Sequence, residues 1–429
     1  MKEIKYPSRA NWPKLLKRPE FERNQFTKVV SDILAEVKQN GDSALIKFTE
    51  KFDGVKLDSL LVSQKEIEIA ISQVSEELAN AIKLAKANIE KFHEAQNISE
   101  LRIETTKGVS CWRRSVGIEK VGLYIPGGSA PLFSTILMLA IPAQIAGCDE
   151  IVLCTPPNSE GNIDSAILFT ANLVGVSKIY KVGGAQAIAA MAFGTASIPQ
   201  VYKIFGPGNQ FVTKAKELIQ QEGVAIDMPA GPSEVLIIAD TTCNPSFVAA
   251  DLLSQSEHGA DSQVILVSDD ESVISQVNIQ LEIQLAQLPR VEVATKSLEN
   301  SRSILLKDMK ECVDFSNEYA PEHLIIASEI ADTFIEKIVN AGSVFLGNYS
   351  CESAGDYASG TNHTLPTNGY ARNYSGVSLD SFVKKITFQK LEKEGIKNIG
   401  PAVEIMAAAE QLFAHKNAVT LRLKEIQDV

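Results

Sequence analysis

The sequence lacks several features that would point to a secreted or membrane protein. Its six cysteines form no CxxC pair and no dense framework, so reduced thiols in a cytoplasm are expected. The first residues contain no apolar core of the kind that a signal peptide needs. The most apolar stretch, residues 131–147, is interrupted by polar residues and is shorter than a membrane span. These absences predict a cytoplasmic protein that has no membrane partner.

Basic residues are also in deficit. The chain has 41 Lys and Arg against 53 Asp and Glu, which gives a net charge of −12. An acidic protein repels phosphate backbones, so we expect no nucleic-acid partner, and anionic membrane surfaces are disfavoured as well. With 429 residues, of which 45% are hydrophobic and 22% charged, the composition is that of an ordinary globular protein with two or more compact units.

Strand patterns alternate with helical patterns in two separate parts of the chain. The predicted strands are residues 117–125, 150–154, 178–182 and 201–205 in the first part, and residues 234–239, 263–267, 323–327 and 343–346 in the second. Helical stretches of roughly ten to fifteen residues between strands imply βαβ units and a parallel sheet. The predicted fold class is therefore α/β, with two Rossmann-like units and small N- and C-terminal lobes.

This prediction divides the chain into four parts. They are a polar N-terminal arm, an α/β domain built from two separated segments, a second α/β domain inserted between those segments, and a helical C-terminal lobe. We expect the two-segment domain to carry the catalytic and metal-binding residues. The boundaries are 1–21 for the arm, 22–122 and 234–378 for the two-segment domain, 123–233 for the inserted domain and 379–429 for the lobe.

Gln255 and His258 are candidate cation ligands. Asn244 is a good N-cap and Gly259 a natural helix stop, so the two candidates lie three residues apart near the C-terminus of one predicted helix. Their amide oxygen and imidazole nitrogen can point at one cation, which the helix dipole also favours at that end. A polar helix end that faces water is the alternative.

Glu322 and His323 stand where a polar loop enters a predicted strand. A carboxylate can take a proton from water, and an imidazole acts as acid or base near neutral pH. Neighbouring residues of a strand point to opposite faces, so both can serve one site only if the turn is irregular. A surface glutamate beside a capping histidine is an equally simple interpretation.

Two further segments add ligand-type side chains. The polar loop at 342–367 contains Asp356 and His363, and loops of this length usually line a site. Glu410 and His415 lie five residues apart, so they share no face of a continuous helix. The nitrogen and oxygen ligands that result suit zinc, with manganese or cobalt as substitutes. The proposed ligand set is Gln255, His258, Asp356 and His415.

The usual dinucleotide fingerprint is missing. Gly206 and Gly208 supply its first two glycines, but Phe211 stands where the third belongs, so a standard Rossmann site is not supported. The strand-ending turns at 124–128, 183–186 and 206–209 can still line a nucleotide groove. An ordinary βα turn explains each of them equally well.

Long motifs of the sequence resemble the histidinol dehydrogenase family from about Gly117 to His415. They are GLYIPGG, GGAQAIAAMAFGT, FGPGN, DMPAGPSEVLIIAD, DLLSQSEHGADSQ, NEYAPEHL and AGDYASGTNHTLPT. The resemblance implies oxidation of L-histidinol to L-histidine, the last step of histidine biosynthesis, through a bound aldehyde with two NAD and one zinc per subunit. It also implies a homodimer with exchanged terminal lobes. Cys351 departs from the family pattern, which has proline there, and its role and that of His363 stay open.

The resemblance implies a role for each site residue. Glu322 and His323 look like the catalytic pair, and Gln255, His258, Asp356 and His415 like the zinc ligands. The substrate contacts would be Ser233, Gln255, His258, His323, Asp356, Glu410 and His415. Tyr124, Gln186 and Asn209 look like NAD contacts, which belong to the inserted domain. Glu410 and His415 would come from the partner subunit, which resolves their spacing.

Three other functions are open at this point. A related zinc and NAD dehydrogenase of another small alcohol would not need to grip an imidazole, and the presence of Ser233, Glu410 and His415 argues for histidinol instead. A zinc hydrolase would use Glu322 to activate water without NAD. A non-catalytic metal-binding protein would have no need of the Glu322 and His323 pair.

Overall fold

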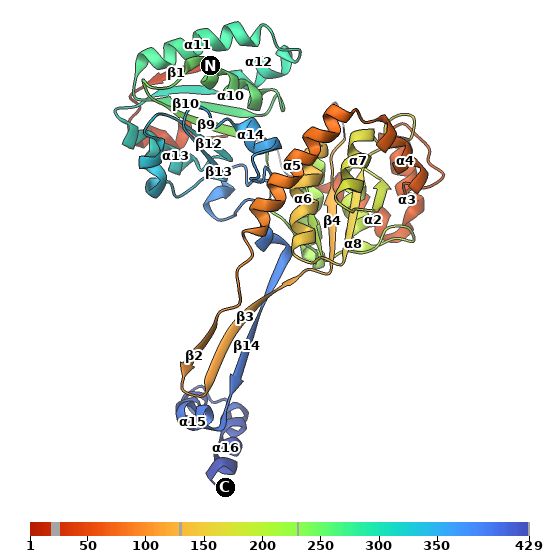
Figure 1. Cartoon of the computed structure of the whole chain (residues 1–429), viewed down its shortest axis with the longest axis vertical. Coiled ribbons are helices and arrows are strands. Elements are labelled where there is room, and N and C mark those ends of the chain that lie inside the picture. Colours follow the sequence, from red (N-terminus) through yellow and green to blue (C-terminus); the bar gives the residue numbers. More distant parts are fainter. Residues whose placement is uncertain (19–25, 128–130, 230, 428–429) are drawn as a thin grey trace.

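Two α/β bodies lie side by side, and a narrow ribbon carries a small helical lobe away from both of them (Figure 1). The computed structural model describes residues 1–18, 26–127, 131–229 and 231–427. Across these residues, no helix combines the length and the apolar character needed to cross a membrane. The predicted α/β class with two parallel sheets is confirmed.

One body is built on a five-stranded parallel sheet in the order β6-β5-β4-β7-β8. Its strands are β4 (Lys120–Tyr124), β5 (Glu150–Thr155), β6 (Lys178–Lys181), β7 (Lys203–Phe205) and β8 (Ala225–Ile226). The crossover helices are α6 (Phe133–Ile145), α7 (Ser165–Leu173), α8 (Gly184–Phe193) and α9 (Gln210–Ile219). The strand order reverses between β4 and β7, which in open α/β sheets is the place where ligands bind.

The helices before β4 pack on this same body. They are α2 (Thr27–Asn40), α3 (Asp42–Phe52), α4 (Gln64–Gln73) and α5 (Glu76–Glu94). Helices α2 and α3 share a core with α8, while α4 packs on α7 and α5 on α6. The assignment of residues 22–122 to the domain of the catalytic residues is therefore corrected. Helical periodicity identifies an apolar face but not the surface that covers it.

The other body is built on a six-stranded parallel sheet in the order β1-β11-β10-β9-β12-β13. Its strands are β1 (Lys2–Lys5), β9 (Glu234–Ala239), β10 (Gln263–Ser268), β11 (Arg302–Leu305), β12 (His323–Ala327) and β13 (Ser343–Leu346). The helices are α1 (Trp12–Leu15), α10 (Pro245–Ser256), α11 (Glu271–Leu285), α12 (Val291–Glu299), α13 (Met309–Tyr319) and α14 (Glu352–Tyr357). Without β1, both sheets have the same strand order.

The N-terminal segment belongs to the six-stranded body. Strand β1 pairs in parallel with β11, and Trp12 is fully buried against Phe315, with ring centroids 5.1 Å apart. The expected arm is thus an edge strand and a packed segment. Its predicted last residues, 19–21, lie outside the described residues.

The ribbon is a three-stranded antiparallel sheet made of β2 (Arg102–Thr106), β3 (Val109–Gly117) and β14 (Val383–Leu391). Strand β14 pairs with β3 from Val383 opposite Gly117 to Leu391 opposite Val109. Helices α15 (Lys393–Ala409) and α16 (Phe413–Gln427) pack on each other at its far end. The sequence predicts a helical lobe here but not the ribbon, because β14 pairs with a strand that lies far away along the chain, whereas β2 and β3 are neighbours.

Candidate active site

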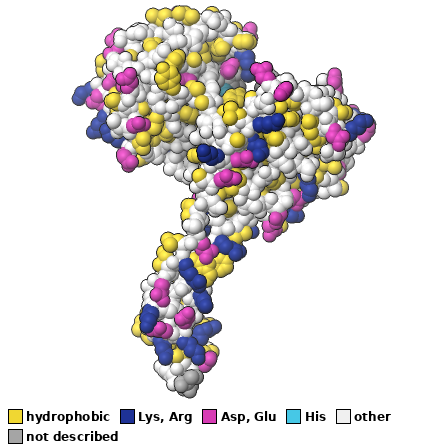
Figure 2. All heavy atoms as spheres, viewed as in Figure 1, with side chains coloured by type: hydrophobic (Ala, Val, Ile, Leu, Met, Phe, Trp, Pro, Cys, Tyr) yellow, Lys and Arg dark blue, Asp and Glu magenta, His cyan; other side chains and the backbone are white. Residues whose placement is uncertain are grey.

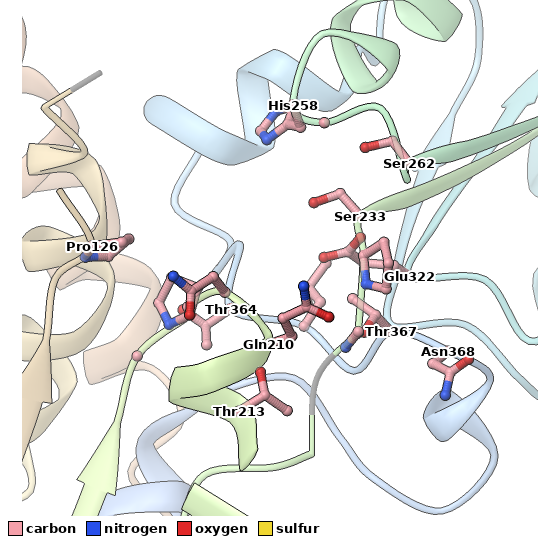
Figure 3. Close-up of a pocket in the computed structure, with 18 of the residues that line it drawn as sticks. Pro126, Gln210, Thr213, Ser233, His258, Ser262, Glu322, Thr364, Thr367 and Asn368 are labelled. Carbon is pink, nitrogen blue, oxygen red and sulfur yellow. The ribbon is translucent and has the colours of Figure 1, made fainter. Parts of the chain in front are cut away.

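A cleft of about 1120 Å³ lies between the two α/β bodies. In Figure 3, Ser233, His258 and Glu322 come from the six-stranded body, whereas Pro126, Gln210 and Thr213 come from the five-stranded body. Eight predicted site residues line this cleft. They are Tyr124, Asn209, Ser233, Gln255, His258, Glu322, His323 and Asp356.

The two sheets contribute opposite edges to the cleft. The five-stranded sheet presents the carboxyl ends of β4 and β7, where ligands are expected. The six-stranded sheet presents its amino ends, because Ser233 directly precedes β9 and Glu322 directly precedes β12. The candidate catalytic pair therefore lies at the strand edge that α/β folds seldom use for a site.

The Glu322 carboxylate is buried and held in a fixed position. Its Oε2 accepts a hydrogen bond of 2.8 Å from the backbone N–H of Glu234 and one of 3.3 Å from Nε2 of Gln255. Glu322 lies just outside β12, and Ala320 before it has a φ of 55°. The turn is thus irregular, as the sequence requires if both Glu322 and His323 are to reach one site.

His323 lies among carboxylates. Its Nδ1 is 3.3 Å from the carbonyl oxygen of Glu234 and 3.6 Å from Oε2 of Glu322, and its Nε2 is 3.5 Å from Oδ1 of Asp356. Burial disfavours the charged imidazole, but the nearby carboxylates of Glu352, Glu322 and Asp356 outweigh burial and raise the pKa of His323 well above its usual value. Such a perturbed group in a cleft is typical of a functional site.

One group of side chains has the spacing of a metal site. The ligand atoms of His258, Glu352 and Asp356 all lie within 4.8 Å of one another. Burial raises the pKa of Glu352 to about 8. The sequence reasoning missed Glu352. Its spacing of four residues from Asp356, which puts the two carboxylates on one face of α14, could have identified it.

Within the part of the chain that the structure describes, several buried polar atoms beside this group find no hydrogen-bond partner. They are Oε1 of Gln255, Nε2 of His323, Oε2 of Glu352 and Oδ1 of Asp356. Buried polar atoms are nearly always paired, so unpaired ones call for an explanation. A divalent cation would satisfy the unpartnered oxygens together, and with the imidazole of His258 this mixture of amide, imidazole and carboxylate groups fits zinc.

His363 has both ring nitrogens occupied. Its Nδ1 is 2.9 Å from the carbonyl oxygen of Asp356, and its Nε2 is 3.1 Å from Oγ1 of Thr135 on α6. Burial lowers the pKa of His363, so a neutral ring that donates from Nδ1 and accepts at Nε2 satisfies both contacts. This histidine links the two bodies behind Asp356.

The turn after β7 is shaped by groups that the sequence reasoning also missed. The Asp227 carboxylate accepts a hydrogen bond of 2.9 Å from the N–H of Gly206. Nζ of Lys216 donates a hydrogen bond of 2.9 Å to the carbonyl oxygen of Gly206. Lys216 and Asp227 form a buried ion pair. Gly206 has a φ of 127°, and a Cβ there would lie 2.0 Å from the carbonyl oxygen of Tyr124. Only glycine fits this position.

The three expected cofactor contacts lie at different depths. Tyr124 and Asn209 line the cleft, and the hydroxyl of Tyr124 accepts a hydrogen bond of 3.0 Å from the N–H of Gly184. Gln186 is buried in α8, beside the Gly184 turn. Gly128, the last residue of the predicted turn after β4, lies outside the described residues.

Glu410 and His415 lie apart from the other candidate residues. Glu410 ends α15 and His415 belongs to α16, so both are in the lobe at the far end of the ribbon (Figure 1), and both are exposed. Within one chain, the cleft is therefore lined by eight of the candidate residues, while Gln186 lies buried in α8 and Glu410 and His415 lie in the distant lobe.

The chain is similar to histidinol dehydrogenases along its whole length. The family model for histidinol dehydrogenase matches residues 16–423. The chain is 60% identical over 427 residues to the enzyme of Bacteroides thetaiotaomicron, covering 100% of both chains. It is 53% identical over 417 residues to that of Escherichia coli, covering 96% of this chain and 95% of the relative. The crystal structure of histidinol dehydrogenase from Elizabethkingia anophelis is 60% identical and superimposes with a TM-score of 0.98, covering 100% of this chain and 99% of that chain.

Proposed function

Because the chain belongs to the histidinol dehydrogenase family, we propose that it oxidises L-histidinol to L-histidine, using two NAD and one zinc ion per subunit. This reaction would be the last step of histidine biosynthesis. One observation carries the proposal. The buried Glu322 and His323 face a cluster of unpartnered ligand atoms in a cleft that also holds a candidate nucleotide groove.

The metal site would consist of Gln255, His258 and Asp356 from the cleft and His415 from a second subunit. The unpartnered oxygens of Gln255 and Asp356 support the first part of this set. A zinc ion held there supplies a Lewis-acidic anchor for the imidazole and amine of the substrate, which fixes the alcohol carbon. Four protein ligands favour this orienting role over the activation of water.

His323 is the proposed base of both oxidation steps. In a neutral His323 that donates from Nδ1 to the carbonyl oxygen of Glu234, 3.3 Å away, the lone pair is on Nε2 and would be free to accept a proton. Nε2 takes the hydroxyl proton while the hydride leaves the same carbon for NAD, which gives the aldehyde and NADH. The carboxylates of Asp356 and Glu352 lie beside the proposed metal site and also raise the pKa of His323. A bound cation would offset their negative charge and so lower the pKa of His323, which would leave the imidazole neutral and able to accept a proton.

Glu322 is the proposed base for the addition of water to the aldehyde. Its Oε2 is held by Glu234 and Gln255, which leaves the other oxygen to bind a water molecule and take its proton. The hydrated aldehyde then loses a second hydride to a second NAD, while His323 again accepts the hydroxyl proton. The products are the carboxylate of histidine and a second NADH.

The proposed NAD groove is the switch point of the five-stranded sheet. Tyr124 ends β4, and Asn209 caps α9 with its side-chain oxygen. The glycine turn at 206–208 allows a close approach of the phosphates, and the N-terminus of α9 favours their negative charge. Gln186 would act from beneath the neighbouring turn. This groove needs no standard glycine fingerprint.

We expect a homodimer in which the lobe of each subunit completes the cleft of the other. Glu410 and His415 then reach the substrate and metal of the partner. The ribbon and lobe expose apolar side chains that a partner would cover (Figure 2). They include Leu101, Ile103, Ile405, Met406 and Phe413, which are between 52% and 72% exposed. Large exposed apolar patches usually mark interaction sites.

NADH absorbance with L-histidinol and NAD tests the proposed function. We expect two NADH per histidinol, loss of activity after chelation and recovery after zinc is added back. No NADH from the zinc-loaded protein would overturn the proposal. Zinc-dependent cleavage of an ester or amide substrate, with no NADH from histidinol, would indicate a hydrolase. NADH from another small alcohol but not from histidinol would indicate a related dehydrogenase.

A further inference from the structure

Arg18 and Glu234 form a buried ion pair at the edge of the proposed active site. We infer that this pair is a positioning device, in which Arg18 fixes Glu234 and the main chain of Glu234 fixes both Glu322 and His323. The roles of the last two residues rest on the proposed function. Residues of the N-terminal segment and of β9, outside the metal and cofactor sets, thus determine the geometry of the acid–base pair.

The ion pair has a two-pronged geometry. Nε of Arg18 donates to Oε1 of Glu234 at 2.6 Å, and Nη2 donates to Oε2 at 2.7 Å. The two side chains are only 15% and 3% exposed. Parallel hydrogen bonds of this kind fix orientation as well as distance, so the Glu234 side chain has little freedom to turn.

Arg18 is itself held by α13. Its guanidinium carbon lies 3.9 Å from the ring centroid of Tyr319, and its Nη2 donates a hydrogen bond of 2.8 Å to the Tyr319 carbonyl oxygen. Tyr319 is fully buried, and its hydroxyl donates to Oε1 of Gln263 at 2.8 Å. The arginine thus connects Glu234 to a rigid part of the six-stranded body.

The backbone of Glu234 contacts both members of the proposed catalytic pair and holds them in position. Its N–H donates to Oε2 of Glu322 at 2.8 Å, and its carbonyl oxygen is 3.3 Å from Nδ1 of His323. The N–H of Asn368 adds a hydrogen bond of 2.6 Å to Oε1 of Glu234. Because one residue holds both catalytic groups, any shift of Glu234 moves the carboxylate and the imidazole together.

The chemistry of the pair favours positioning over simple stabilisation. Glu234 places a second carboxylate next to Glu322 in a buried site, and Arg18 offsets that charge. Buried ion pairs stabilise a fold no better than apolar side chains of similar volume, and their best-supported use is to fix one arrangement. Here the arrangement that they fix includes both catalytic groups.

The test compares Arg18→Lys and Glu234→Gln with a matched control. Arg18→Lys keeps the charge but loses the fork, and Glu234→Gln keeps the size but loses the charge. The control is Arg9→Met, because Arg9 lies in the same N-terminal segment and pairs with Asp314 at 2.5 Å, yet its side chain is 61% exposed and does not line the cleft. Melting temperature is measured for every variant.

We expect both site variants to lower kcat by about 10- to 100-fold, as small displacements of catalytic groups do, with KM values for histidinol and NAD within about 2-fold of wild type. The double variant should be no worse than the poorer single variant, since both changes break one connection. Arg9→Met should leave kcat unchanged. A raised KM for NAD with an unchanged kcat would show that Arg18 contacts the cofactor and would overturn the inference.

Nitrogen NMR of the histidine side chains gives a readout that does not depend on the proposed reaction. The chain has only five histidines, and a His323→Gln variant assigns the His323 signals. Arg18→Lys should shift these signals and leave those of the buried His93 in place. Unchanged His323 signals, or a fall in melting temperature alone, would reduce the pair to a structural role. A shift of the His323 signals in a protein without histidinol activity would uphold the positioning and reject the reaction.

Discussion

Glu352 adds a buried carboxylate to the proposed metal site. The ligand set implied by the family resemblance omits it, yet its side chain is buried beside His258 and Asp356 with one oxygen unpaired. Outer groups around a metal tune its affinity by their charge. We therefore expect Glu352 to strengthen cation binding even if it is not itself a ligand.

Replacing Glu352 by glutamine should weaken zinc binding by about 10-fold or more, measured by competition with a chelator. Glu257→Gln is the control, because Glu257 lies next to His258 but outside the cluster. Equal zinc affinity in wild type and Glu352→Gln would contradict this prediction. Zinc binding would then depend only on the four proposed ligands, without a contribution from Glu352.

Variants of the two proposed catalytic residues, Glu322 and His323, should lose different steps of the proposed reaction. With Glu322→Gln, the first hydride transfer should persist but hydration of the aldehyde should stop, so each histidinol gives one NADH in place of two. His323→Gln should lose both steps, since the same nitrogen serves each of them. The ratio of NADH formed to histidinol consumed measures the difference. Full conversion to histidine by Glu322→Gln would refute the assignment.

At the scale of elements, the strands and helices of the two sheets are largely predictable from sequence. The runs at 234–239 and 263–267 are almost entirely apolar, and each becomes a strand buried along its length. The turns before both runs contain glycine, and aspartate follows each run, which sets the boundaries. Predictions from such local patterns need no knowledge of distant partners.

Long-range packing could not be predicted in the same way. The pairing of β14 with β3 joins residues that are far apart in the chain, and β14 alternates only weakly between exposed and half-buried positions. The placement of α2 to α5 and the pairing of β1 with β11 also depend on surfaces that periodicity does not identify. The amino-edge position of Glu322 and His323 follows from how the two bodies face each other.

The glycine turn after β7 gives a test at this scale. Gly206→Ala should weaken NAD binding and lower stability by about 1–3 kcal/mol, because its Cβ would meet the Tyr124 carbonyl oxygen at 2.0 Å. Gly223→Ala is a matched control, since its φ is also positive at 89° but a Cβ there meets nothing within 4 Å. Calorimetric titration with NAD and thermal unfolding measure both effects. Equal NAD affinity in the two variants would contradict a cofactor role for this turn.

At the scale of the whole molecule, the cleft of one chain lacks two of the proposed substrate contacts. The sequence places Glu410 and His415 five residues apart, and the structure puts both in an exposed lobe at the end of the ribbon. A single chain gives no reason for such an exposed arrangement. The proposed dimer with exchanged lobes would account for the lobe's exposed apolar residues, for the distance of His415 from the other proposed ligands and for the length of the ribbon.

A mixed dimer tests whether each lobe completes the cleft of the other subunit. One subunit carries His415→Ala and the other His323→Ala, with different affinity tags so that the mixed species is purified alone. Each homodimer should be inactive. If each lobe completes the cleft of the other subunit, the mixed dimer contains one intact site and should have about half of the wild-type activity per dimer. An inactive mixed dimer that still binds one equivalent of NAD per subunit would show that each lobe serves its own chain, and would contradict the account.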